Sequence, residues 1–340
     1  MVLDLPLIWS VVIAAAVLLY VLLDGFDLGI GALFPFATDA ERDVMTASIA
    51  PVWDGNETWL VLGGGGLFAA FPLAYSIVMP AFYAPIIAML AALIFRGVAF
   101  EFRAHGRRMG RRLWTWAFAG GSILAMVAQG FILGSFVQGV AVSGRSFSGA
   151  PFDWLTPFSA LTAVSLTLGY ALLGACWLIG KTEGELQDKA RRWARRLVFA
   201  VALAMALVSL ATLWVNPAVS ARWGVSKSAI DWGRLATLSP APLLGLVGFV
   251  LTFLSAGRRE ARFAPYLGSA AVFLSGYAGL ALSIAPYVVP YQVTLWQAAA
   301  RDNALGLLLV GVVVLLPVIL GYTAYVYWLF RGKASADHGY

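Results

Sequence analysis

The sequence Leu23-Asp24-Gly25-Phe26-Asp27-Leu28-Gly29 closes an apolar run in which residues 7–23 carry no charge. This run, continued through the quoted residues, is long enough to cross a bilayer, so it predicts a membrane-spanning helix. An acid at the centre of a span costs on the order of 2.5–3.5 kcal/mol, so acids in spans usually have a function. The two aspartates are three residues apart and share one helix face. The two glycines form a small-xxx-small pair, which predicts close approach of another helix.

The rest of the chain has the composition of a membrane protein. Of its 340 residues, 61% are hydrophobic and 12% are charged, whereas about a quarter are charged in soluble proteins. We expect an all-α polytopic protein that forms a single integral membrane domain over residues 1–340. Apolar length predicts about nine spans, at 7–34, 57–78, 80–100, 114–138, 155–180, 196–215, 240–256, 265–287 and 304–330.

The positively charged residues give the orientation of these spans. With nine spans, 18 of the 23 Lys and Arg residues fall on one side of the membrane. The five on the other side are Arg145, Arg222, Lys227, Arg234 and Arg301. Because the cytoplasmic side carries the excess of Lys and Arg, we expect the N-terminus outside and the C-terminus in the cytoplasm. The net charge of +6 is thus explained without a nucleic-acid partner.

Polar residues gather at the cytoplasmic ends of the first three spans. The second span opens with Trp53-Asp54-Gly55-Asn56-Glu57-Thr58-Trp59, and the third ends with Arg96 and Glu101. Asp24 and Asp27 at the end of the first span would handle protons, or one of them would simply pair with Arg96. Both explanations are common for intramembrane acids.

Asp54 has a similar pair of explanations. It lies three residues before Glu57, which fits a variant capping box with Asp54 as the N-cap of the second span. It is also placed to pass protons from the cytoplasm toward the acids of the first span. The two roles are compatible.

Two further patterns predict packing and membrane depth. The run Gly63 to Gly66 lacks the Lys and Ser/Thr of a phosphate-binding loop and predicts close helix packing. Aromatic residues near the cytoplasmic end of the last span predict an interfacial belt, made by Tyr322, Tyr325, Tyr327 and Trp328.

Redox cofactors are not expected in this chain. Its two histidines, His105 and His338, lie in a basic loop and in the C-terminal tail, so neither would face a haem inside the bundle. Cys176 is the single cysteine, and metal sites need more such ligands. If the chain belongs to a redox enzyme, the redox centres are in another subunit.

Three stretches together resemble a known family. They are residues 23–29, residues 49–59 and Phe95-Arg96-Gly97-Val98-Ala99-Phe100-Glu101. In this order and spacing they are similar to subunit II of the cytochrome bd-type quinol oxidases, and the compact chain resembles the short, cyanide-insensitive branch. The resemblance implies two four-helix bundles plus one peripheral helix, with an acid-containing first bundle (1–138) facing the partner and a second bundle with the peripheral helix over 155–330.

The resemblance also implies a function and partners. Subunit I would carry haems b and d and the quinol site, and this chain would bind none of them alone. A structural quinone, lipids and a small single-span accessory subunit remain open, in a bacterial inner membrane. This chain would contribute a cytoplasmic proton route from Asp54, Asp27, Asp24, Glu57 and Glu101. The supporting residues would be Trp53, Asn56 and Arg96.

Two other functions remain open from the residues alone. A proton-coupled transporter would also place acids in a span, although transporters usually carry broken helices at the midplane of both repeats. A purely structural assembly subunit would use the same acids only as caps and ion pairs.

The charge bias makes a direct prediction about sidedness. A reporter fused after Tyr340 should be cytoplasmic, and one inserted between Val142 and Phe152 should be external. Reporter activity or accessibility on both sides of the membrane measures this, and two reporters on the same side would show that the number of spans is wrong.

Overall fold

The computed structural model describes residues 3–105, 108–225 and 229–335. The side chains of residues 104, 105, 108 and 109 are outside that description, as are Arg107, Lys227, His338 and the chain end at Tyr340. The helices and short strands follow in this order: α1 Leu5–Leu33, η1 Phe34–Phe36, α2 Asp39–Ile49, α3 Trp53–Ala70, α4 Pro72–Ala81, α5 Tyr83–His105, α6 Arg108–Gln138, β1 Val142–Ser143, β2 Ser146–Phe147, α7 Pro157–Lys181, α8 Gly184–Val215, α9 Pro217–Arg222, α10 Trp232–Leu238, α11 Pro240–Ala256, α12 Ala264–Ile284, β3 Tyr287–Val289, β4 Val293–Thr294, α13 Leu295–Ala298 and α14 Asp302–Leu329.

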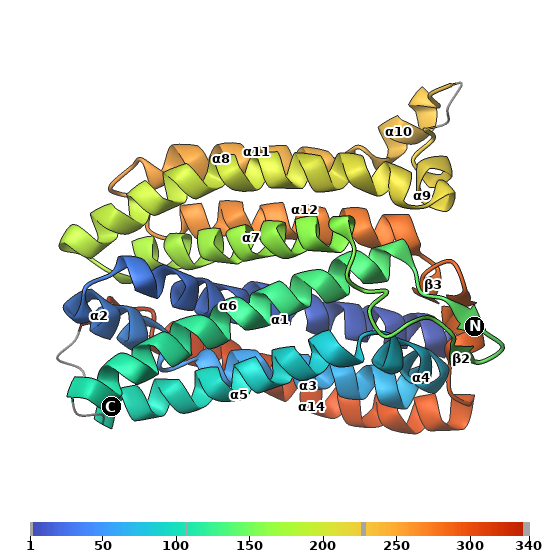
Figure 1. Cartoon of the computed structure of the whole chain (residues 1–340), viewed down its shortest axis with the longest axis horizontal. Helices are drawn as coiled ribbons and strands as arrows, with labels where there is room; N and C mark the ends of the chain where they lie inside the picture. The colour runs from blue at the N-terminus through green and yellow to red at the C-terminus, as the bar shows by residue number, and fades with distance from the viewer. Residues whose placement is uncertain (1–2, 106–107, 226–228, 336–340) are drawn as a thin grey trace.

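The all-α polytopic prediction is confirmed. Within the described residues, seven helices are long and apolar enough to cross a membrane, and an eighth span results if α10 and α11, bent by 51°, are taken together. The predicted number of nine is therefore approximate. Figure 1 shows the long helices side by side, with α8 and α11 on one side of α7 and α12, and α14 on the opposite side of the bundle.

The predicted second span is not one helix. α3 ends at Ala70 and α4 begins at Pro72. Phe71 between them has φ −130° and ψ 62°, outside the helical region. A proline lacks the amide hydrogen and disfavours the helical conformation of the residue before it. The sequence Phe71-Pro72 therefore breaks the segment that apolar length alone had joined.

The bundle is centred on α7, which packs against α1, α6, α8 and α12. Its second half, from Gly169 to Lys181, is buried throughout. Phe26 of α1 stacks on Trp177 of α7 with ring centroids 4.0 Å apart. By contrast, only Leu305 is fully buried among the residues of α14.

Glycine permits the closest contact in this core. A Cβ atom added to Gly29 would lie 1.8 Å from the carbonyl oxygen of Tyr170, and one added to Gly174 would lie 2.6 Å from the backbone of Gly29. The predicted close approach at Gly29 is confirmed. The prediction for residues 63–66 holds only in part, because Gly63 and Gly66 face α1 while a Cβ on Gly64 or Gly65 would meet nothing within 4 Å.

A short amphipathic helix, α2, covers one end of the bundle. Its Glu41 pairs with Lys189 of α8 at 2.8 Å, and its Asp43 pairs with Arg103 of α5 at 3.0 Å and with Arg111 of α6. Burial tends to raise the pKa of Glu41, but hydrogen bonds from Lys189 and Thr38 outweigh it and hold that pKa below its ordinary value. Ionised Glu41 thus stabilises the fold at neutral pH, and this contribution is lost as the pH falls through its lowered pKa.

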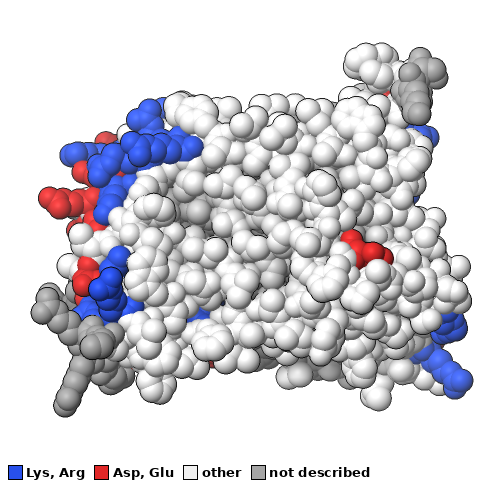
Figure 2. Space-filling model, in the orientation of Figure 1, with Lys and Arg blue, Asp and Glu red and all other residues white. Residues whose placement is uncertain are grey.

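The end that carries α2 is also the basic end of the molecule. The ends of α5, α7, α11 and α14 lie there in Figure 1, whereas the start of α1, α9 and α10 lie at the other end. Figure 2 shows Lys and Arg side chains gathered mainly at the α2 end, and few on the long apolar sides. We call this end the basic end.

The contact at Gly29 yields a stability prediction. Gly29→Ala should destabilise the protein by about 1–3 kcal/mol, because the added methyl group meets backbone that cannot move away easily. Gly64→Ala is the matched control, since it adds a methyl group to open space in a helix and should be neutral or slightly stabilising. Thermal unfolding of the two detergent-purified variants measures the difference, and equal midpoints would contradict the packing described here.

Candidate functional site: a buried acid cluster at the basic end

Four helices bring their polar residues together at the basic end. Asp24 and Asp27 lie in the last third of α1, and Asn56 and Glu57 lie in the first turns of α3. Arg96 lies in the second half of α5 and Tyr327 near the end of α14. We call Asp24, Asp27, Asn56, Glu57 and Arg96 the acid cluster.

Arg96 connects two of the acids. Its side chain is only 1% exposed, and its Nη1 lies 2.7 Å from Oδ1 of Asp24, whose side chain is fully buried. Its Nη2 lies 3.4 Å from Oε2 of Glu57, whose side chain is 29% exposed. The pairing of Arg96 with an intramembrane acid, one of the two explanations for that pair of aspartates, is thus present for Asp24.

Asp27 has a different partner. Its Oδ2 accepts a hydrogen bond of 2.8 Å from Nδ2 of Asn56, which also donates to the carbonyl oxygen of Leu23 at 3.2 Å. The other carboxyl oxygen, Oδ1, is buried and has no hydrogen-bond partner within the described part of the chain. Buried polar atoms without partners are rare in proteins, and each requires an explanation.

Trp53 covers the outer side of the arginine. Its ring lies 6.0 Å from the guanidinium carbon of Arg96 and packs on Phe100 of α5. The predicted supporting residues Trp53, Asn56 and Arg96 are therefore all in place around the two aspartates.

Asp54 and Glu101 are exposed and lie on the surface near the acid cluster. The helix α3 begins at Trp53, so its N-cap is Val52, without a side-chain hydrogen bond. The prediction that Asp54 caps this helix is therefore wrong. Asp54 instead lies in the first turn, where a negative charge interacts favourably with the helix dipole. Glu101 is five residues beyond Arg96 on α5.

Three polar residues, two of them buried tyrosines, extend the acid cluster toward the middle of the bundle, and the sequence analysis missed them. Tyr20 is buried and lies one turn before Asp24 on α1. Gln129 of α6 donates to the hydroxyl of Tyr20 at 2.7 Å and accepts from the hydroxyl of Tyr170 at 2.9 Å. Tyr20 is four residues before Asp24, on the same helix face, and this spacing was the available signal.

Tyr327 was also placed wrongly by the sequence pattern. Tyr322, Tyr325 and Trp328 are more than half exposed, as a belt requires, but Tyr327 points inward and donates to Oδ1 of Asn56 at 2.8 Å. At 3.6 residues per turn, Tyr327 lies about 200° around the helix from Tyr325, so the helical period could have separated it from the belt.

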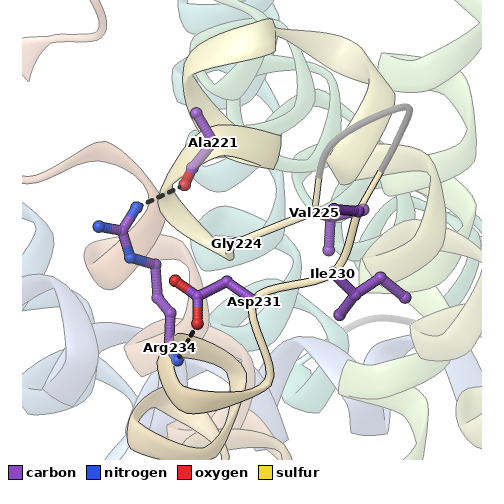
Figure 3. A pocket seen from close by; sticks show the side chains of 7 residues that line it. Ala221, Gly224, Val225, Ile230, Asp231 and Arg234 are labelled. Atoms are coloured by element: carbon purple, nitrogen blue, oxygen red, sulfur yellow. Dashed lines mark hydrogen bonds between the residues drawn. The ribbon is translucent and has the colours of Figure 1, made fainter.

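The described residues offer little else that resembles a binding site. They contain no group of three or more His, Cys, Asp or Glu side chains that could hold a metal ion. A shallow pocket lies at the end opposite α2, between α9 and α10 (Figure 3). There, Asp231 accepts from the backbone N–H of Arg234, whose guanidinium donates to the carbonyl oxygen of Ala221. These contacts stabilise the loop itself.

Known proteins with similar sequences share one description. Residues 5–330 match the family model of cytochrome bd terminal oxidase subunit II. The cytochrome bd-I ubiquinol oxidase subunit 2 of Escherichia coli is 31% identical over 98% of this chain and 96% of that protein. The cytochrome bd ubiquinol oxidase subunit 2 of Bacillus subtilis is 25% identical over 96% of each chain.

A solved structure agrees with this description at the level of the fold. A chain in the structure of the bd oxidase from Geobacillus thermodenitrificans superposes with a TM-score of 0.75 and 17% identity, over 97% of this chain and 100% of that chain. The expected resemblance to subunit II of the cytochrome bd-type oxidases is confirmed, and the family favours an oxidase subunit over a transporter. The chain is an inner-membrane protein that belongs to the family of cytochrome bd terminal oxidase subunit II, and is thus one subunit of a quinol oxidase.

Proposed function

We propose that this subunit carries protons from the cytoplasm through the acid cluster toward the oxygen-reducing site of its partner, subunit I. The observation that carries the proposal is the gradient of burial along the acids. Asp54 is exposed, Glu57 is partly exposed, and Asp24 and Asp27 are buried. A proton relay needs successive groups that accept and release protons within hydrogen-bond reach, directly or through one water.

The charges of the acid cluster favour a shared proton. Asp24, Asp27 and Glu57 are three carboxyl groups near a single guanidinium, that of Arg96. If all three were ionised, the cluster would hold uncompensated negative charge away from water, which is costly. One proton shared among the three carboxyl groups reduces this negative charge. The carboxyl group that holds the proton can then change when the charge of the partner's site changes.

The residues have separate roles in this proposal. Asp54 collects protons at the surface, with Glu101 as a second exposed acid on α5. Glu57 and then Asp24 and Asp27 receive them. Arg96 stays protonated throughout, because a guanidinium does not give up its proton in proteins; it fixes the positions of Asp24 and Glu57, and Trp53 shields it.

The proposal includes an orientation and a partner surface. The basic end faces the cytoplasm and the N-terminus lies outside, in agreement with the gathering of Lys and Arg at that end (Figure 2). The first bundle, residues 1–138, faces subunit I, which holds haems b and d and the quinol site. α3 and α5 carry large exposed apolar side chains that such a contact would cover, namely Val61, Phe68, Ile94, Phe95 and Phe102. Other exposed apolar faces, such as that of α14, would contact lipids, a small single-span accessory subunit or a bound quinone.

A first prediction tests the relay. In the assembled oxidase, Asp54→Asn, Asp24→Asn and Asp27→Asn should each lower quinol-driven oxygen consumption by about tenfold or more, because an amide cannot ionise. Asp302→Asn, an exposed acid at the other end of the bundle, is the control and should retain full turnover. Since Asp54 is not an N-cap, Asp54→Ala should assemble as well as Asp54→Asn.

The same variants distinguish a relay from a scaffold. If Asp24→Asn fails to assemble while Asp54→Asn and Asp27→Asn turn over like the parent, the acid cluster holds helices together and carries no protons. Haem content of the purified complex measures assembly separately from turnover.

A second prediction concerns the partner. The chain expressed alone should purify without haem, and the complex with subunit I should show haem absorption. The reason is that no intramembrane histidine is available in this sequence to ligate haem. Stoichiometric haem in the absorption spectrum of the isolated chain would contradict the assignment of all haems to the partner.

A further inference from the structure

The last helix reaches the acid cluster through one side chain. α14 is almost entirely exposed, yet Tyr327 turns toward α1 and α3. Its ring lies edge-on to Trp177, with centroids 6.0 Å apart, and Trp177 in turn stacks on Phe26. Phe26 directly precedes Asp27. Tyr327 is therefore packed against the same aromatic group that surrounds the buried acid.

The hydroxyl of Tyr327 holds the oxygen end of the Asn56 amide. An asparagine side chain has one end that only accepts and one end that only donates hydrogen bonds. The oxygen of Asn56 accepts from Tyr327, and its nitrogen donates to Asp27 and to the carbonyl oxygen of Leu23. If the amide turned over, its oxygen would face two acceptors. The carbonyl oxygen of Leu23 and the carboxylate of Asp27 thus set the orientation of the amide, and Tyr327 holds its oxygen end in place.

This orientation matters for the charge of Asp27. A nitrogen donor at 2.8 Å from Oδ2 stabilises an ionised carboxylate, and hydrogen bonds to an ionised group are stronger than those between neutral groups. When Asp27 loses its proton, the resulting carboxylate already accepts a hydrogen bond from Nδ2 of Asn56. No comparable donor reaches the other oxygen, Oδ1, within the described residues.

The position of Tyr327 along the membrane normal is itself held by the chain that follows it. Lys181 at the end of α7 donates to the carbonyl oxygen of Phe330. Lys333 donates to the carbonyl oxygen of Thr182 at 2.8 Å, and the N–H of Ala334 donates to the carbonyl oxygen of Lys181 at 2.8 Å. These contacts hold residues 330–334, which begin three residues after Tyr327, against the junction of α7 and α8.

We propose that Tyr327 is a positioning residue for Asp27, acting through Asn56. The inference rests on the proposed proton route, and it adds that the peripheral last helix acts on one of the two buried acids of that route. Tyr327 does not exchange the proton itself. It holds the oxygen end of the Asn56 amide, so that the nitrogen stays within hydrogen-bond reach of Asp27 in every cycle.

The test compares Tyr327→Phe with Tyr325→Phe in the complete oxidase. Tyr325 lies on the same helix and is 55% exposed, so its change is a matched loss of one hydroxyl. Infrared difference spectra between oxidised and reduced enzyme report the carboxyl bands, and Asp27→Asn identifies the band of Asp27. We expect this band to shift in Tyr327→Phe and to stay in place in Tyr325→Phe, with haem content equal in all variants.

Steady-state kinetics give a second readout. In Tyr327→Phe, kcat should fall by about two- to tenfold, the factor that corresponds to one lost neutral hydrogen bond. KM for quinol should not change, because quinol binds in the partner. In an Asn56→Leu background, which removes the amide, adding Tyr327→Phe should change kcat no further, because the two residues act in series.

The outcomes separate this inference from the proposed proton route. If Asp27→Asn removes a carboxyl band but Tyr327→Phe leaves it in place, the positioning role is wrong and the route stands. If Asp27→Asn changes no band and no turnover, the route through Asp27 fails, and the positioning role fails with it. If Tyr327→Phe loses haem, or if its effect adds fully to that of Asn56→Leu, the hydroxyl holds the fold and the positioning role is wrong.

Discussion

The structure depends on the burial of one charged pair, Asp24 with Arg96. Two ions that leave water together need each other's charge, and the guanidinium of Arg96 lies 2.7 Å from the buried carboxyl group of Asp24. This requirement fixes the distance between α1 and α5 at the basic end. It also draws in Glu57, the second carboxylate of Arg96, and with it the first turns of α3. The guanidinium of Arg96 on α5 thus holds α1 and α3 close to it at the basic end.

A second constraint acts on the other side of α1. The acids face α3 and α5, whereas Gly29 lies against the backbone of α7. Because glycine has no side chain, α7 can approach to backbone contact, and its buried half fills the centre of the bundle. α1 is thus held by charge on one face and by close packing on the other. Both contacts oppose a shift of α1 along its axis, so the depth of Asp24 and Asp27 in the bundle is fixed.

The sequence predicted the parts of this arrangement that depend on local pattern. Apolar length placed most spans within a few residues, and the spacing of Asp24, Asp27, Asn56, Glu57 and Arg96 was enough to group them. Where two local signals competed, the prediction was wrong. Pro72 ends the helix within an apolar run that hydropathy predicts as one span, and α3 starts at Trp53, so Asp54 is not its N-cap. Tyr327 and Gln129 could not be assigned to the site in the same way, because they come from helices distant in sequence. Their partners are set by tertiary packing, which apolar length and motif spacing do not encode.

The last helix is hydrogen-bonded to early helices at both ends of the bundle, to α1 at one end and to α3 at the basic end. Trp9 of α1 donates to the carbonyl oxygen of Leu305 at 3.0 Å, and Tyr327 reaches Asn56 at the basic end. The consequence concerns the order of synthesis. Residues 24 to 96 enter the membrane early, whereas α14 leaves the ribosome last. Asn56, the hydrogen-bond donor of Asp27, therefore lacks its own donor, Tyr327, until α14 is made, and a truncated product inserts with this site unfinished.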